Sequence, residues 1–250
     1  MRRFFYDKTA VCGEEIQINE HDAKHIVKVL RMTVGTPIEM VCAGQCFTAE
    51  LSKVANGDVR AKLLDTLDTY EESDRNIYLI QGVAKGEKMD FILQKSVELG
   101  LHTFIATECT RSVVRIIGDK EEKRLARWNK ISEEAAKQCG RIHIPEAKLA
   151  NGMKQAIAML PEDTAIILAW EEEENLGLKT ILPDITAKNI AIIVGPEGGL
   201  TEDEVTVAKN AGAQIVSLGK RILRTETAAL ALLSITQYQL GDLGGACRND

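Results

Sequence analysis

The feature that most constrains the fold of this chain is an alternation, from Asn76 onward, between short apolar runs and longer amphipathic segments. The runs are Ile77–Gln81, Thr103–Thr107, Thr164–Ala169, Asn189–Val194 and Gln214–Leu218. Runs that are apolar at consecutive positions are typical of strands buried on both faces. We therefore predict an α/β domain with a mostly parallel sheet covered by helices.

Segments with helical periodicity separate these runs. They are Glu87–Leu99, ended by Gly100, Lys120–Cys139, Asn151–Leu160, Glu202–Ala211 and Glu226–Leu240. The last one is apolar on every face through Ala228–Leu233 and continues with Ile235 and Tyr238. A helix without a polar face is buried on all sides, which predicts a place in the middle of the core or in a subunit interface.

The first seventy residues have a different pattern. Five short strands are predicted at Arg3–Tyr6, Glu15–Ile18, Pro37–Val41, Cys46–Val54 and Val59–Leu64, with turns at Gly13, Gly35, Gly44 and Asn56-Gly57. One helix capped by Asn19 presents Ala23, Ile26, Val27 and Leu30 on one face. This pattern favours a small β-barrel. We predict two domains, 1–70 and 75–250, joined by the acidic segment Asp65–Asp74.

The charge of the chain is unevenly distributed. The total of −6 over 250 residues argues against a protein that coats nucleic acid. Arg111–Lys148 nevertheless holds ten Lys and Arg against six Asp and Glu, whereas Glu171–Glu174 is wholly acidic. No apolar run reaches membrane-spanning or secretory length, so a cytoplasmic protein is expected.

Cysteine and histidine give little support for a metal site. The six cysteines are scattered, and only Cys42 and Cys46 are close together, with a spacing that is neither a redox CxxC nor half of a zinc knuckle. His21 and His25 lie one helical turn apart, but no third ligand is near. We predict unpaired thiols and no metal.

Two loops at predicted strand ends could form a ligand site, because open α/β sheets bind ligands at the carboxyl ends of their strands. The first, Gly195–Thr201, has three glycines, and Thr201 with Glu204 predicts a capping box. It has neither the lysine of a P-loop nor the spacing of a dinucleotide fingerprint. The second, Leu218–Thr227, places Arg221, Arg224 and Glu226 at the start of an apolar helix.

The charges of the second loop have two interpretations. An Arg224–Glu226 ion pair with Thr225 as helix cap would be purely structural, because a charge beside an apolar helix is costly unless it is paired. Alternatively, a guanidinium and a carboxylate stand at the edge of a cleft. The sequence up to this point leaves both open.

Together these segments resemble the SPOUT methyltransferases and are most similar to the RsmE family, which methylates N3 of a uridine in 16S ribosomal RNA. The two loops read GPEGGLT and LGxRILRTETA. The other matching segments are His25–Arg31, Lys85–Asp90, Gln94–Gly100, Glu108–Ser112 and Glu134–Arg141. The resemblance runs nearly end to end.

The resemblance implies a PUA-like N-terminal barrel that helps to hold RNA and a SPOUT domain with a trefoil knot. It also implies S-adenosylmethionine as the cofactor, a homodimer with the active site near the subunit interface, and 16S rRNA in the assembled 30S subunit as the substrate. The cofactor-binding residues that it implies are Leu168, Ala169, Gly195, Glu197, Gly198, Leu218, Gly219, Ile222 and Leu223.

Uridine N3 loses a proton when it is methylated. An arginine can stabilise the resulting imide anion and a carboxylate can accept the proton, so Arg224 and Glu226 are the predicted catalytic residues. The predicted phosphate contacts are Arg2, Arg3, Lys24, Lys28, Arg31, Arg111, Arg115 and Arg141. Phe4, Phe5 and Tyr6 could stack on bases or pack in the core.

Three alternatives remain. The same fold could methylate another base or a ribose 2′-hydroxyl. A non-catalytic RNA-binding module would have no need to keep the glycines of both loops. A dinucleotide enzyme is disfavoured, because Gln81–Gly86 has the wrong glycine spacing for a Rossmann fingerprint.

Overall fold

The computed structural model describes residues 1–55, 57–67, 72–116 and 120–245. Two compact units are present: unit 1 comprises Met1–Glu71 with Lys137–His143, and unit 2 comprises Glu72–Ala136 with Ile144–Asp250. Part of the predicted linker, residues 68–71, and Asn56 of one predicted turn lie outside the described residues. No helix among the described residues is long and apolar enough to cross a membrane.

Unit 1 contains one five-stranded sheet, in the order β1-β3-β4-β5-β2. The strands are β1 (Arg2–Tyr6), β2 (Glu15–Gln17), β3 (Pro37–Cys42), β4 (Gln45–Ala55) and β5 (Asp58–Leu67). Only the β1–β3 pair is parallel. All five predicted strands are confirmed, and Phe4 packs in the core of this sheet, whereas Phe5 and Tyr6 are half-buried.

The predicted helix of unit 1 is also confirmed. Asn19 accepts a hydrogen bond from the Asp22 amide at 2.9 Å and caps α1 (Glu20–His25). The helix continues as a π-helical segment, η1 (Ile26–Leu30), which periodicity alone did not predict. Ile26 on the predicted apolar face is fully buried.

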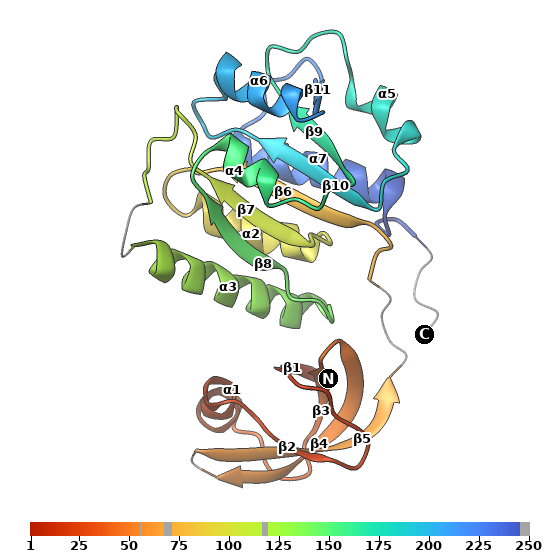
Figure 1. Ribbon diagram of the computed structural model, residues 1–250. Helices are drawn as coiled ribbons and strands as arrows, with labels where there is room; N and C mark the ends of the chain where they lie inside the picture. The colour runs from red at the N-terminus through yellow and green to blue at the C-terminus, as the bar shows by residue number, and fades with distance from the viewer. Residues whose placement is uncertain (56, 68–71, 117–119, 246–250) are drawn as a thin grey trace. The chain divides into compact units, whose positions relative to one another are not determined.

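Unit 2 is built on a six-stranded sheet in the order β11-β9-β10-β6-β7-β8, and every pair is parallel (Figure 1). The strands are β6 (Asn76–Gly82), β7 (Thr103–Thr107), β8 (Glu146–Ala150), β9 (Thr164–Ala169), β10 (Asn189–Val194) and β11 (Gln214–Val216). The predicted parallel sheet is therefore confirmed. β8 was missed because an edge strand, half exposed, lacks a continuous apolar run.

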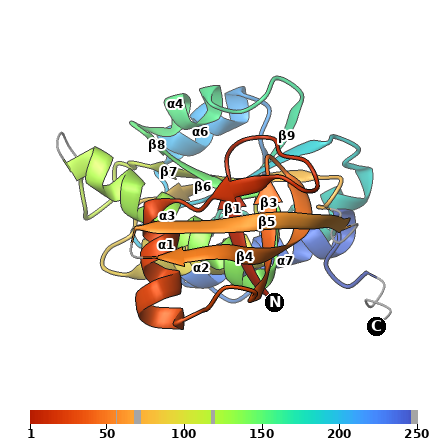
Figure 2. The same cartoon turned by 90° about the horizontal axis from the view of Figure 1, so that it is seen from below.

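Helices cover both faces of this sheet. The helices are α2 (Lys88–Glu98), α3 (Lys120–Cys139), α4 (Met153–Ala158), α5 (Leu178–Ile181) with η2 (Leu182–Asp184), α6 (Glu202–Asn210) and α7 (Thr225–Leu240). Both views show α2 and α7 on one face and α4 and α6 on the other (Figures 1 and 2). All five predicted helices are present, whereas the short α5 and η2 were not predicted.

α7 corrects one expectation. Its buried face contains Ala229, Leu232 and Leu233, but Ile235 is 42% exposed and Tyr238 is 69% exposed in this chain. The helix is therefore not buried on all sides within one chain, so the interpretation as a core helix is wrong. Its exposed apolar face leaves the subunit-interface interpretation open.

Cys12, Cys42, Cys46 and Cys109 are free thiols, and Cys247 lies outside the described residues. Burial raises the pKa of Cys42 to about 11 and that of Cys109 to about 12. Both thiols therefore stay protonated near neutral pH, and a protonated thiol is a poor nucleophile and metal ligand.

Candidate cofactor and substrate site

The site lies where the strands of unit 2 end. A cavity of about 940 Å³ is lined by the turn after β9, by the first loop (Gly195–Thr201, after β10) and by the second loop (Leu218–Thr227, after β11). Because all strands are parallel, their carboxyl ends meet at one edge of the sheet, where ligands of open α/β sheets bind. The structure thus brings together the two loops that the sequence marked.

Most residues that the resemblance assigned to the cofactor line this cavity. They are Ala169, Gly195, Glu197, Leu218, Gly219, Ile222 and Leu223. Leu168 is fully buried beneath the cavity in the core. Gly198 faces another way, because a Cβ atom there would lie 2.9 Å from the carbonyl oxygen of Arg111. These two residues support the site from behind.

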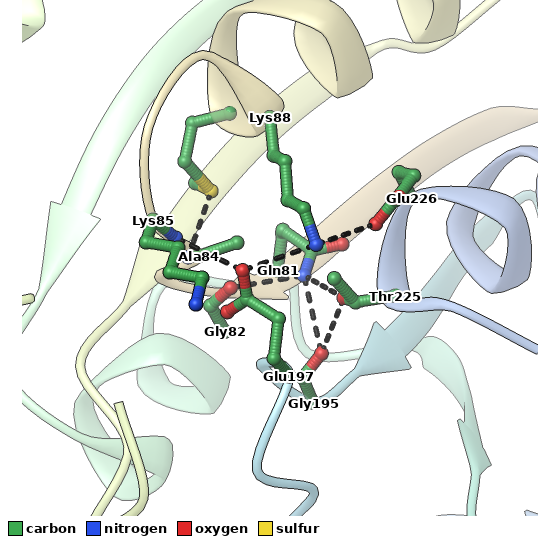
Figure 3. A network of polar contacts seen from close by, with 10 residues as sticks. Gln81, Gly82, Ala84, Lys85, Lys88, Gly195, Glu197, Thr225 and Glu226 are labelled. Atoms are coloured by element: carbon green, nitrogen blue, oxygen red, sulfur yellow. Dashed lines mark hydrogen bonds and ion pairs between the residues drawn. The ribbon is translucent and has the colours of Figure 1, made fainter. Parts of the chain in front are cut away.

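The first loop is held by hydrogen bonds that begin on β6 and α7. The Gly195 carbonyl accepts from Thr225 Oγ1 at 2.6 Å and from Gln81 Nε2 at 3.3 Å, and the same Gln81 nitrogen donates to Thr225 Oγ1 at 2.9 Å (Figure 3). Gln81 is fully buried. Together these bonds fix the start of the first loop against the end of the second.

At the far end of the first loop, the predicted capping box is confirmed. The Glu204 amide donates to Thr201 Oγ1 at 3.3 Å, and the Thr201 amide donates to Glu204 Oε2 at 2.9 Å. Between its two fixed ends the loop passes close to β6: a Cβ atom on Gly82 would lie 2.5 Å from Pro196 Cδ. Only glycine fits at position 82.

A lysine that the sequence reasoning did not single out stands between the two loops. Lys88 Nζ, in the first turn of α2, lies 3.2 Å from Glu197 Oε1 and 3.2 Å from Glu226 Oε2 (Figure 3). The Lys85 amide also donates to Glu197 Oε1, at 3.2 Å. Both lysines belong to the Lys85–Asp90 motif, so the motif marked the segment without revealing its contacts.

This ion-paired group shifts three pKa values. Burial disfavours the charge of Lys88, but the two carboxylates outweigh burial and raise its pKa. Burial alone would raise the pKa of Glu197, yet backbone hydrogen bonds and Lys88 lower it overall. Hydrogen bonding to its own backbone amide lowers the pKa of Glu226, and Lys88 lowers it further. All three groups are charged at neutral pH.

The proposed structural pair of the second loop is not formed. Glu226 is paired with Lys88 rather than with Arg224, and the Thr225 hydroxyl donates to Gly195 instead of capping α7. Arg224 is exposed and lines the cavity, whereas Glu226 does not line it. The prediction of an Arg224–Glu226 ion pair with a Thr225 cap is therefore wrong: both Glu226 and Thr225 have other partners.

One side of the cavity, formed by the turn after β9, suits an organic cation. Glu171, Glu173 and Glu174 line this side. Apolar side chains such as Leu218 and Leu223 line another. The buried Nε1 of Trp170, in the same wall, finds no hydrogen-bond acceptor among the described residues, so a bound ligand can supply one. No group of three potential metal ligands occurs among the described residues.

The predicted RNA-binding arginines differ in accessibility. The Arg3 side chain is 8% exposed and pairs with Glu39 at 2.8 Å within unit 1, and Arg141 is 4% exposed. Arg111 donates to the Leu200 carbonyl at 3.2 Å, although it remains exposed. The other candidates, Arg2, Lys24, Lys28, Arg31 and Arg115, are exposed.

Known proteins are similar to this chain in sequence and in fold. A family model described as an RNA methyltransferase domain matches residues 71–237. Ribosomal RNA small subunit methyltransferase E of Bacillus subtilis is 34% identical, with 98% of this chain and 99% of the relative covered. The chain belongs to the ribosomal RNA small subunit methyltransferase E family. The predicted membership is thus confirmed, and with it the prediction of an RNA methyltransferase.

Two solved structures of methyltransferases agree. The methyltransferase E of Neisseria gonorrhoeae bound to S-adenosyl methionine has a TM-score of 0.86 and 34% identity, over 97% of this chain and 99% of that one. A Legionella pneumophila methyltransferase in complex with the same cofactor has a TM-score of 0.82 and 30% identity, over 96% of this chain and 98% of that one. The α/β architecture is therefore that of the family.

Proposed function

We propose that this protein transfers the methyl group of S-adenosylmethionine to N3 of one uridine in 16S ribosomal RNA. The observation that carries the proposal is the cavity between the two glycine-containing loops, in a chain of the methyltransferase E family. When bound, the cofactor supplies an electrophilic methyl group. No metal is required, because the reaction depends on aligning that methyl group with the nucleophile.

The cavity offers groups that match the adenine and the cationic parts of the cofactor. The backbone of Gly195 and Gly219 can approach an adenine edge closely, and Leu218 and Leu223 offer apolar contact to its ring. The carboxylates of the turn after β9 offer charge complementarity to a sulfonium and an ammonium group. We propose that Leu168 and Gly198 support the residues that line the cavity and do not contact the cofactor themselves.

For catalysis we assign different roles to Arg224 and Glu226. Arg224 lines the cavity, where its guanidinium can stabilise the imide anion that forms as uridine N3 loses its proton. The Glu226 carboxylate is held by Lys88 outside the cavity lining, so it positions the second loop in this conformation instead of acting as the base.

The remaining proposals concern assembly and substrate. We propose that unit 1 closes into a PUA-like barrel, that the C-terminal segment forms the trefoil knot of SPOUT enzymes, and that two chains pair through the exposed apolar face of α7. The acidic total charge favours a structured target, the assembled 30S subunit in the cytoplasm, over bare RNA. Arg2, Lys24, Lys28, Arg31, Arg111 and Arg115 remain proposed phosphate contacts; the buried Arg3 and Arg141 do not.

The test is methyl transfer to a defined nucleoside. The protein is incubated with labelled S-adenosylmethionine and either naked 16S rRNA or small subunits that lack the modification, and the product is identified after digestion. We expect 3-methyluridine, formed faster on assembled subunits. No incorporation and no cofactor binding by calorimetry would refute the enzymatic proposal, whereas a different methylated nucleoside would refute the uridine-N3 assignment.

A further inference from the structure

Unit 2 contains a second recess whose side chains are mostly cationic. Its volume is about 410 Å³, and the loop residues Val114 and Ile116 form an apolar wall. The remaining lining residues are Arg115, Lys120, Lys123, Arg124 and Arg127. Of these, only Arg115 was predicted from the sequence as an RNA contact.

The sequence of α3 explains this concentration of charge. Positions 120, 123, 124 and 127 have the i, i+3, i+4, i+7 spacing that places side chains on one face of a helix. Trp128, the next residue after Arg127, is fully buried: its ring lies edge-to-face with Phe104 at 6.0 Å between centroids, and its Nε1 donates to Asp90, the carboxylate that pairs with Arg127. Trp128 and Asp90 thus anchor the edge of the cationic face of α3 to the rest of unit 2.

Two of the cations are held in place and three are free. Arg115 pairs with Glu108 at 3.4 Å and Arg127 with Asp90 at 2.5 Å. Lys120, Lys123 and Arg124 form no ion pair with another described residue. Like charges this close repel one another, and an anionic ligand relieves that repulsion.

The recess lies at the same edge of the sheet as the cofactor cavity. Its loop leaves the carboxyl end of β7, which is next to β6 in the sheet. The same loop contacts the first loop: Arg111 Nη1 donates to the carbonyls of Gly198 and Leu200, at 3.3 and 3.2 Å. A single short segment therefore connects the recess to the cavity.

We infer that this recess binds phosphate groups of the ribosomal RNA backbone next to the nucleotide that enters the cavity. The inference rests on the proposed function, because an RNA substrate at the cavity brings polyanionic backbone to this edge of the sheet. Phosphates are the anions that lysine and arginine clusters on RNA enzymes bind, and such contacts position the substrate without reading its bases.

The test is the salt dependence of RNA binding, measured without cofactor on a 16S rRNA transcript. The Lys120→Ala/Lys123→Ala variant is compared with Lys188→Ala/Lys209→Ala, which removes two exposed lysines outside the recess. The logarithm of affinity falls linearly with the logarithm of salt concentration, and each lost phosphate contact makes this slope shallower by about 0.7 to 0.9. For the recess variant we expect a slope that is shallower by about 1.4 to 1.8 and weaker binding of the transcript. The control variant should match the wild type in both.

Three outcomes decide the inference. A loss confined to the recess variant, with unchanged thermal unfolding and unchanged S-adenosylmethionine affinity, supports it. Equal losses in both variants, or no loss in either, overturn it, since the recess then contributes no more than general charge. Because the transcript assay needs no methyl transfer, failure of the proposed reaction would appear separately, as absence of 3-methyluridine with the wild-type protein.

Discussion

The two loops that face each other across the cavity are held very differently. The first loop is fixed at its start by Gln81 and Thr225, in its middle by Lys88, and at its end by the capping box. A loop with contacts at its start, middle and end keeps its shape without a ligand. It therefore provides a preformed wall for the cofactor.

The second loop has few such contacts before it reaches Thr225. Ile222 is 88% exposed, and Lys220, Arg221 and Arg224 are exposed as well. Segments with few buried contacts have low local stability and can adapt to ligands. We therefore propose that the first loop is the rigid wall of the cofactor site, whereas the second loop adds cofactor contacts at Leu218–Leu223 and carries Arg224 toward the substrate.

Removing the guanidinium of Arg224 should have the largest effect. If Arg224 stabilises the imide anion, Arg224→Ala should lower kcat by about 100-fold, as expected for loss of one preorganised donor. The affinity for S-adenosylmethionine, measured by calorimetry, should change little. Arg221→Ala, on the same loop and in the same cavity wall, is the matched control. Equal losses of kcat in the two variants would contradict the assignment.

The second prediction concerns the rigidity of the first loop. Gly82→Ala places a Cβ atom 2.5 Å from Pro196 Cδ, so the first loop must move. Overpacking of this kind costs about 2 kcal/mol, which corresponds to roughly 30-fold weaker cofactor binding. Gly177→Ala is the control, since Gly177 also lines the cavity but has open space at its Cβ position. Unchanged cofactor affinity in Gly82→Ala would show that the first loop is not preformed.

The third prediction tests Lys88 as the connection between the loops. Lys88→Met leaves the Glu197 and Glu226 carboxylates facing each other without a cation, so the KM for S-adenosylmethionine should rise by about fivefold. Adding Glu226→Gln removes one of the repelling charges and should restore part of the affinity. If the double variant binds cofactor no better than Lys88→Met, the two residues are not coupled.

The smallest expected effect is the response to pH. Because the folded state lowers the pKa values of Glu197 and Glu226, their contribution to stability is complete above pH 4.5 and is lost as pH falls through the lowered values. These two carboxylates should therefore add no pH dependence to the midpoint of thermal unfolding above pH 5, and the midpoint should decline below it. In the Glu197→Gln/Glu226→Gln variant the decline of the unfolding midpoint below pH 5 should be shallower than in the wild type. An identical decline would show that other carboxylates cause the loss of stability.

Several elements could be predicted because their cause is local. The consecutive apolar residues of β9 and β10, the Asn19 cap and the Thr201–Glu204 capping box depend on neighbours within a few positions of the chain. The two loops carried enough motif residues to reveal the family. The prediction missed β8. Because this edge strand is half exposed, its residues form no continuous apolar run, and its sequence does not differ from that of a loop.

The sequence by itself therefore determined the parallel sheet, the family and the two segments that form the cavity. Only the tertiary structure decided which side chains join them. Gln81 and Lys88 lie more than a hundred positions before the residues they contact, and Glu226 pairs with Lys88 rather than with the nearby Arg224. Such pairings depend on the three-dimensional approach of strand ends, which spacing along the chain does not encode. The basic recess on one face of α3, by contrast, falls within the basic segment Arg111–Lys148 that the sequence already marked, although the charge total of −6 concealed it.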